Sequence, residues 1–229
     1  MNTTKIFLII FSLATIVHIT AILLGKEKLR QISKCLIIPP LLAAYAAGSE
    51  IRIPFIIPAL VLGWIGDVLL LKIDKSAFFK LGLCSFLLGH ICYIIAFIYL
   101  LGLFGFGGMV PIAGTGSINI PAILIFTPPA IVLGAVVIRL IKPTKEMRFP
   151  VIFYMVVLET LTLFGFQIFL FNPGIAGLLI LSGCLCFMVS DTILAYYTFR
   201  KLKLSGAVLI MAYYILAQAE IIFGLMSLQ

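Results

Sequence analysis

Charged side chains are scarce in this chain. Lysine, arginine, aspartate and glutamate make up 10% of its 229 residues, whereas soluble domains carry about 25%. Only 8 residues are acidic and only 2 are histidines. So little polar surface excludes a soluble enzyme or a separate soluble domain. It also leaves few side chains for acid–base chemistry.

The chain also lacks the short motifs of several enzyme classes. It contains no Gly-x-Ser-x-Gly, no His-Glu-x-x-His, no Walker loop and no dinucleotide fingerprint. Its five cysteines all lie in apolar stretches, and the spacing of Cys184 and Cys186 points them to different faces of a helix. We therefore expect buried free thiols and no metal site.

Long apolar runs fill the rest of the chain, which is 63% hydrophobic with a mean hydropathy of +1.28. A helix needs about 20 apolar residues to cross the hydrocarbon core. We predict an all-α polytopic bundle of eight transmembrane helices that forms a single integral membrane domain over residues 1–229. The second segment is short and contains Pro39-Pro40, so we expect it to be kinked or shallow. The predicted segments are 5–24, 32–47, 53–71, 81–101, 118–141, 150–171, 174–199 and 204–226.

Basic residues collect on one side of this predicted bundle. When the connections are assigned alternately to two sides, Lys5 and Arg52 are the only basic residues of the 16 on the other side. The positive-inside rule places the basic loops in the cytoplasm and both termini outside. We expect a multi-pass protein of a bacterial inner membrane, in contact with membrane lipids and not with nucleic acid. The basic side carries Lys26, Lys28, Arg30, Lys34, Lys72, Lys75, Lys80, Arg139, Lys142, Lys145, Arg148, Arg200, Lys201 and Lys203.

Two aspartates lie inside apolar segments, each in a [Gly/Ser]-Asp-x-x-Leu sequence. Asp67 and Asp191 are 124 residues apart, and the same offset relates Gly82 to Gly206. This offset is compatible with a four-plus-four parallel repeat. Acidic residues within membrane segments are costly and mark functional sites. Both aspartates belong to the cytoplasmic half of helices with the same direction, and we expect them to share one pocket.

The fourth segment carries a stripe of aromatic residues that includes a histidine. Spacings of three and four place Phe86, His90, Tyr93 and Phe97 on one helical face. This pattern predicts either a packing stripe or, beside Asp67, part of a shared polar site.

Several other polar residues lie in or near the apolar segments. Lys34 opens the second segment, where it could meet a lipid phosphate or act as a snorkelling anchor. Glu159 is expected to face the bundle interior, either in the site or as a structural group. His18 and Glu220 have no recognisable partners in the sequence.

The chemistry of the two aspartates admits three interpretations. Paired carboxyl groups in a low-dielectric pocket can supply a general acid and a general base for hydrolysis. The same groups would serve a proton-coupled transporter of a lipid or small solute. They could also simply hydrogen-bond neighbouring helices.

The order of these motifs resembles the YhhN-type lysoplasmalogenase family. The likeness rests on Gly-Asp-x-x-Leu at Asp67, Gly-x-x-x-Phe-x-x-x-His-x-x-Tyr from Gly82, Ser-Asp-x-x-Leu-Ala at Asp191 and the segment at Lys34. It implies a membrane hydrolase that cleaves the vinyl ether bond of lysoplasmalogens, giving a fatty aldehyde and glycerophosphocholine or glycerophosphoethanolamine.

The resemblance also implies roles for particular residues. Asp67 and Asp191 would be catalytic, one as the acid and one as the ionised carboxylate, as in other oxocarbenium-forming hydrolyses. The partner would be a lysophospholipid within the bilayer, and no cofactor or metal is implied. Supporting or substrate-binding roles would fall to Lys34, His90, Tyr93, Glu159, Ser190 and Gln218.

Overall fold

The computed structural model describes residues 2–50, 52–73, 75–103, 118–200 and 206–228, and it is all-α over these ranges. Lys201, Lys203 and the predicted start of the last segment at residue 204 lie outside the described residues. The chain divides into two compact units, which are described separately: residues 1–96 with 225–227, and residues 97–224. The prediction of one domain over the whole chain stays a prediction.

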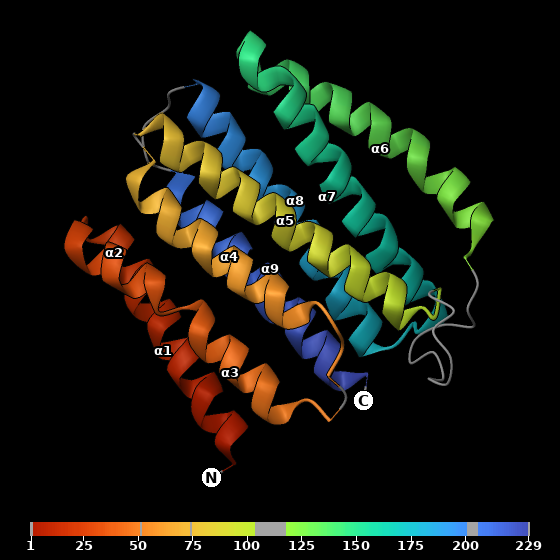
Figure 1. The fold of residues 1–229 in the computed structure, drawn as a ribbon, viewed down its shortest axis with the longest axis horizontal. Coiled ribbons are helices and arrows are strands. Elements are labelled where there is room, and N and C mark those ends of the chain that lie inside the picture. Colours follow the sequence, from red (N-terminus) through yellow and green to blue (C-terminus); the bar gives the residue numbers. More distant parts are fainter. Residues whose placement is uncertain (1, 51, 74, 104–117, 201–205, 229) are drawn as a thin grey trace. The chain divides into compact units, whose positions relative to one another are not determined.

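The first unit is built from the N-terminal helices. In it, α1 packs against α2 and α3, and both α2 and α3 contact α4 (Figure 1). The side chain of Asn2 accepts a hydrogen bond from the backbone of Thr4 and so caps the start of α1. The elements are α1 (Thr3–Leu23), α2 (Glu27–Cys35), α3 (Ile38–Gly48), α4 (Ile56–Leu69), η1 (Leu70–Lys72) and most of α5 (Ser76–Leu100).

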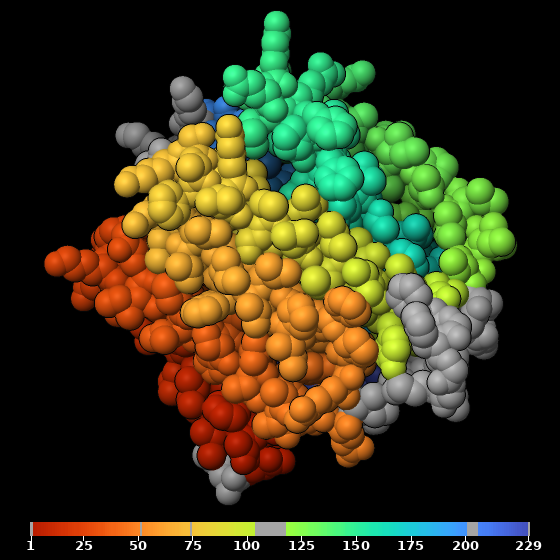
Figure 2. All heavy atoms as spheres, in the orientation of Figure 1, coloured from red at the N-terminus to blue at the C-terminus, as the bar shows by residue number. Residues whose placement is uncertain are grey.

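The second predicted segment, residues 32–47, contains a break between two helices and is not one kinked span. One helix ends at Cys35 and the next begins at Ile38. Pro39 and Pro40 lie in the first turn of α3, where a missing backbone N–H costs nothing. Our expectation that these prolines bend the interior of a helix was therefore wrong. On the face drawn in Figure 2, side chains fill the space between the ribbons of α3 and α4.

The second unit consists of α6 (Ile120–Ile141), α7 (Lys145–Phe171), α8 (Ile175–Arg200) and most of α9 (Ala207–Ser227). Within it, α7 and α8 pack side by side, and α6 contacts both of them (Figure 1). A Cβ atom at position 183 on α8 would lie 2.9 Å from the carbonyl oxygen of Ala217 on α9. Glycine is required there because the two helices approach so closely.

The protein is a multi-pass integral membrane protein. Six helices are long and apolar enough to cross a bilayer: α1, α5, α6, α7, α8 and α9. Each of the eight predicted segments coincides with a helix, but α3 has 11 residues and α4 has 14, fewer than a span requires. The prediction of eight spans is thus confirmed for six of them. The outside position of both termini and the four-plus-four repeat stay predictions.

Candidate functional site

Asp67 lies two residues before the end of α4, and its side chain is almost completely buried. One carboxylate oxygen, Oδ1, is 3.4 Å from the ammonium nitrogen of Lys34 in the last turn of α2. The side chain of Asp67 is 2% exposed and that of Lys34 is 10% exposed. Lys34 is therefore the counter-charge of a buried carboxylate. The sequence had suggested instead a lipid phosphate or a snorkelling position.

A second polar contact holds α2 in place, one residue before Lys34. The imidazole Nδ1 of His18 on α1 is 2.9 Å from the hydroxyl oxygen of Ser33. Because Ser33 donates its proton to the carbonyl of Leu29 at 2.7 Å, Nδ1 of His18 is the donor to Ser33. His18 is fully buried. This contact fixes the rotation of α2 about its axis, with Lys34 directed toward Asp67.

The exposed face of α2 is stabilised by local charge pairs. Glu27 accepts two hydrogen bonds from Arg30 and a third from Gln31. These bonds, with Arg30 as the larger cause, lower the pKa of Glu27 to about 2. The Glu27 carboxylate also lies in the first turn of α2, where a negative charge interacts favourably with the helix dipole. α2 therefore presents a charged outer face and a polar inner face.

Close packing between α4 and α5 surrounds the Asp67 region. A Cβ atom at Gly66 would lie 2.7 Å from the ring of Phe86, so the residue before Asp67 must be glycine for that ring to fit. Ser85 on α5 donates to the carbonyl of Leu62 at 2.6 Å. On the other side of α4, Trp64 donates its indole N–H to the carbonyl of Cys35 at 2.8 Å.

The predicted aromatic stripe on α5 is buried as a whole. Phe86, His90, Tyr93 and Phe97 are each at most 8% exposed. Their burial agrees with a common helical face. The role of His90 and Tyr93 beside Asp67 stays a prediction.

Asp191, in the second unit, has a partner that the sequence did not indicate. The phenol of Tyr154 on α7 donates to Oδ2 of Asp191 on α8 at 2.6 Å. A bond this short constrains the orientation of the Asp191 carboxyl group. Because the carboxyl group is planar, this bond to Oδ2 also limits the positions that the second oxygen of Asp191 can take. The pocket that we expected Asp67 and Asp191 to share stays a prediction, because each aspartate belongs to its own unit.

Ser190 joins two helices of the second unit, whereas the hydrogen bond from Gln218 to Tyr214 lies within α9. Ser190 donates to the carbonyl of Ile210 on α9 at 3.0 Å, and Gln218 donates to the phenol oxygen of Tyr214 at 3.4 Å. Both side chains are buried. The ring of Phe187 packs edge-on against Tyr214 with centroids 6.0 Å apart.

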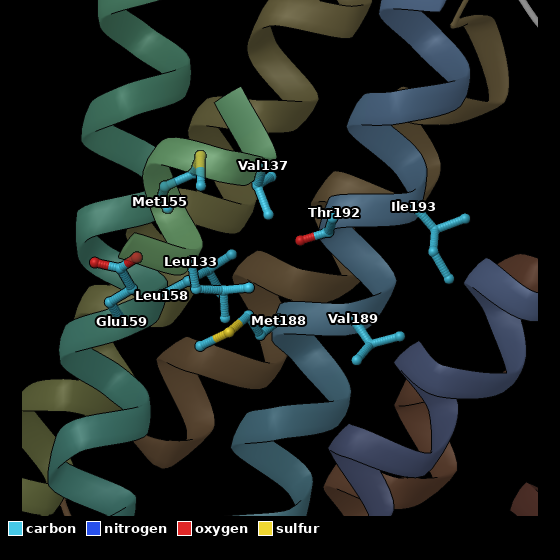
Figure 3. A pocket seen from close by; sticks show the side chains of 10 residues that line it. Leu133, Val137, Met155, Leu158, Glu159, Met188, Val189, Thr192 and Ile193 are labelled. Carbon is cyan, nitrogen blue, oxygen red and sulfur yellow. The ribbon is translucent and has the colours of Figure 1, made fainter. Parts of the chain in front are cut away.

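Glu159 lies on α7 at a cavity of about 210 Å³ between α6, α7 and α8 (Figure 3). A Cβ atom at Gly134 on α6 would be 2.7 Å from Oε1 of Glu159, so the missing side chain makes room for the carboxyl group. Glu159 is half-buried and faces this cavity between three helices; its role in the site or as a structural group stays a prediction. Among the residues that the structure describes, no group of three or more His, Cys, Asp or Glu side chains could hold a metal ion.

A comparison with models of known protein families shows to which family the chain belongs. The model of the YhhN family matches residues 29–225. The chain belongs to the YhhN family. The matched range includes Lys34, Asp67, Tyr154, Glu159 and Asp191. No curated protein and no solved structure matches the chain.

The contacts of this YhhN family member include several that sequence reasoning missed. The sequence did not single out Tyr154, and it indicated no partner for His18. Glu220 accepts a long hydrogen bond of 3.8 Å from the thiol of Cys186, although the sequence indicated none. A polar residue inside an apolar run is the sequence signal that could have drawn attention to these residues. The signal does not identify the partner, because the sequence does not show which helices are in contact.

Proposed function

We propose that this protein is a membrane hydrolase that cleaves the vinyl ether bond of lysoplasmalogens. The observation that carries the proposal is the YhhN family match across residues 29–225, because that family includes lysoplasmalogenases. The proposal is also supported by chemistry: the matched range contains two membrane-embedded aspartates, each with a defined polar partner. The products are a fatty aldehyde and glycerophosphocholine or glycerophosphoethanolamine.

The reaction needs one acid and one negative charge. Protonation of the β-carbon of the vinyl ether converts it to an oxocarbenium ion, and water adds to the cationic carbon. The resulting hemiacetal loses the glycerol oxygen as an alcohol and becomes the aldehyde, and the proton released from water restores the acid. No cofactor is needed. The acid must be positioned at the alkene, and a carboxylate must stabilise the cation.

We assign these two roles from the partners of each aspartate. The ammonium group of Lys34 stabilises a negative charge on Asp67, so Asp67 is the carboxylate that stabilises the cation. Tyr154 binds Oδ2 of Asp191, and the second oxygen of Asp191 carries the proton that is donated. Both carboxyl groups must act on one substrate molecule for this mechanism to operate.

The test is release of free aldehyde by the purified protein in detergent. We expect aldehyde from a 1-alkenyl lysophospholipid and none from the ester lysophospholipid with the same head group. Asp67→Asn and Asp191→Asn should each lower the rate by at least about 100-fold, the usual contribution of general acid–base catalysis. Glu220→Gln is the matched control, since it removes a membrane carboxyl that accepts a long hydrogen bond from the thiol of Cys186 and has no role in the proposed reaction.

Two results would contradict the proposal. Full activity in either aspartate variant, with thermal stability like that of the wild type, would remove the acid–base assignment. A proton-coupled carrier would instead move lysolipid across sealed vesicles without changing its mass. Mass spectrometry of the recovered lipid separates that outcome from hydrolysis.

A further inference from the structure

A continuous groove runs along α8 in the second unit. The cavity at Glu159 shares Val137, Thr192 and Ile193 with an adjoining cavity of about 300 Å³. Leu133 on α6 lines the first cavity and Leu140, two turns later, lines the second. We name this combined space the α6–α8 groove. Figure 3 shows its first part, with Leu133 and Val137 from α6 and Thr192 and Ile193 from α8.

The lining of the α6–α8 groove is apolar for most of its length. In the first part, Glu159 and Thr192 are the only lining side chains with oxygen atoms. Leu133 and Leu140 are 48% and 54% exposed, so the groove opens on the apolar surface of this unit. A polar solute would gain little from such a lining, whereas a hydrocarbon chain is compatible with it.

One end of the groove carries positive charge. Arg200, at the end of α8, donates to the carbonyl of Leu140 at 2.9 Å and lies 6.0 Å from the ring centroid of Tyr196. Lys142 follows α6 directly. Tyr196 and Tyr197 line the groove at this end, and tyrosines are enriched where a membrane meets water. The charge at this end is complementary to a lipid phosphate.

The other end of the groove lies deeper in the apolar part of the unit, at Glu159. Arg200 follows Asp191 by nine residues, which is about 13 Å along the helix. Glu159 follows Tyr154, the partner of Asp191, by five residues or about 7 Å. The level of Asp191 therefore falls between the basic end and Glu159. Thr192, the residue after Asp191, lines both parts of the groove.

We propose that the α6–α8 groove binds the single hydrocarbon chain of a lysophospholipid, with its phosphate at the basic end and its chain directed toward Glu159. This inference rests on the proposed function, because it specifies where the alkenyl chain of that substrate lies. In this orientation the vinyl ether, a few bonds from the phosphate, reaches the level of Asp191. The part of the groove beside Leu133 receives the distal methylenes, so it sets the preference for chain length.

The first experiment uses a bulky residue to fill the distal part of the groove. Leu133→Trp should lower kcat/KM for an octadecenyl lysolipid by about tenfold or more relative to a hexenyl lysolipid, which is too short to reach Leu133, as expected when two methylenes lose their burial. Val132→Trp is the matched control, because Val132 is the neighbouring residue, is 63% exposed and does not line the groove. An unchanged chain-length profile in Leu133→Trp, with aldehyde still released, would overturn the groove assignment.

The second experiment does not depend on hydrolysis. The purified protein is incubated with a saturated 1-alkyl lysophosphocholine that carries a diazirine at the end of its chain, and crosslinked peptides are mapped by mass spectrometry. We expect crosslinks at α6 and α8 residues of the groove, lost in Leu133→Trp and kept in Val132→Trp. Crosslinks spread evenly over other exposed apolar faces would overturn the inference. Groove-specific crosslinks without any aldehyde release would support the groove and refute the hydrolase.

Discussion

Lys34 and Asp67 form a buried ion pair, and this burial sets the cost of removing either charge. We predict that Lys34→Met destabilises the protein by about 3–5 kcal/mol, because it leaves a buried carboxylate without its ammonium partner. Asp67→Asn combined with Lys34→Met should recover much of this loss, since no charge then stays buried. Thermal unfolding of the detergent-solubilised protein measures both effects.

The control for this cycle is another lysine of the same helix. Lys28 is exposed on α2, so Lys28→Met should change the unfolding temperature very little. If Lys34→Met were as stable as Lys28→Met, the ion pair would have no energetic role. The assignment of Asp67 as the ionised carboxylate would then lose its support.

Individual residues of the site could be predicted only in part. Asp67 and Asp191 stand out because a carboxyl group inside an apolar run is costly and therefore rare. Their partners do not stand out: Lys34 is one of many basic residues near a membrane surface, and Tyr154 is one of 8 tyrosines. Partnership depends on which helix faces are in contact, and hydrophobicity along the chain does not encode that information.

At the scale of helices, close backbone approach between α8 and α9 depends on glycine. We predict that Gly183→Ala destabilises the protein by about 1–3 kcal/mol, because the new Cβ would lie 2.9 Å from the carbonyl oxygen of Ala217 and the backbone must shift. Gly165→Ala on α7 is the comparison. Its Cβ would meet the thiol of Cys184 at 2.8 Å, a side-chain group that can move.

Unfolding temperatures of the two variants distinguish backbone crowding from side-chain crowding. Gly183→Ala should be the less stable of the two. Equal stability of both variants with the wild type would mean that α8 and α9 are not packed at the distance described, and the contacts of Ser190 with α9 would be in doubt as well.

The helices themselves were predictable because apolar length is a strong signal, whereas their interruptions were not. Every predicted segment contains a helix, but the second prediction merged the end of α2 with α3. The polar residues of α2 were interpreted as a loop, since a search for membrane spans averages over about 20 residues. A nine-residue helix with one polar inner face is too short to appear in such an average, although it supplies Lys34.

For the whole molecule, the side of the membrane on which each loop lies follows from charge. Basic residues crowd the connection between α6 and α7 and the end of α8, whereas few lie in the loop between α3 and α4. The positive-inside rule therefore predicts that the basic connections lie in the cytoplasm. The arrangement of the two units cannot be obtained in this way, because charge bias fixes sidedness and not helix contacts.

The loop between α3 and α4 is the critical point for this topology. The two helices, with 11 and 14 residues, extend only about 16 Å and 21 Å, less than the hydrocarbon thickness of about 30 Å. A re-entrant hairpin would leave the loop inside the bilayer. However, the loop contains Glu50 and Arg52, whose charges would be costly there. Since α2 extends the path to α3 from the cytoplasmic side, we predict that the loop reaches the outer surface.

Labelling of introduced cysteines with a membrane-impermeant maleimide tests this prediction. In a variant whose five cysteines are replaced by alanine, Ser49→Cys should be labelled in intact cells. Lys145→Cys, at the start of α7, should react only after the cells are permeabilised. Protection of Ser49→Cys in both conditions would identify a re-entrant hairpin and reduce the spans from eight to six. Both counts are even, so the two termini would lie on the same side of the membrane in either case. Reaction of Lys145→Cys in intact cells would show that the basic loops are outside, and the predicted orientation would then be wrong.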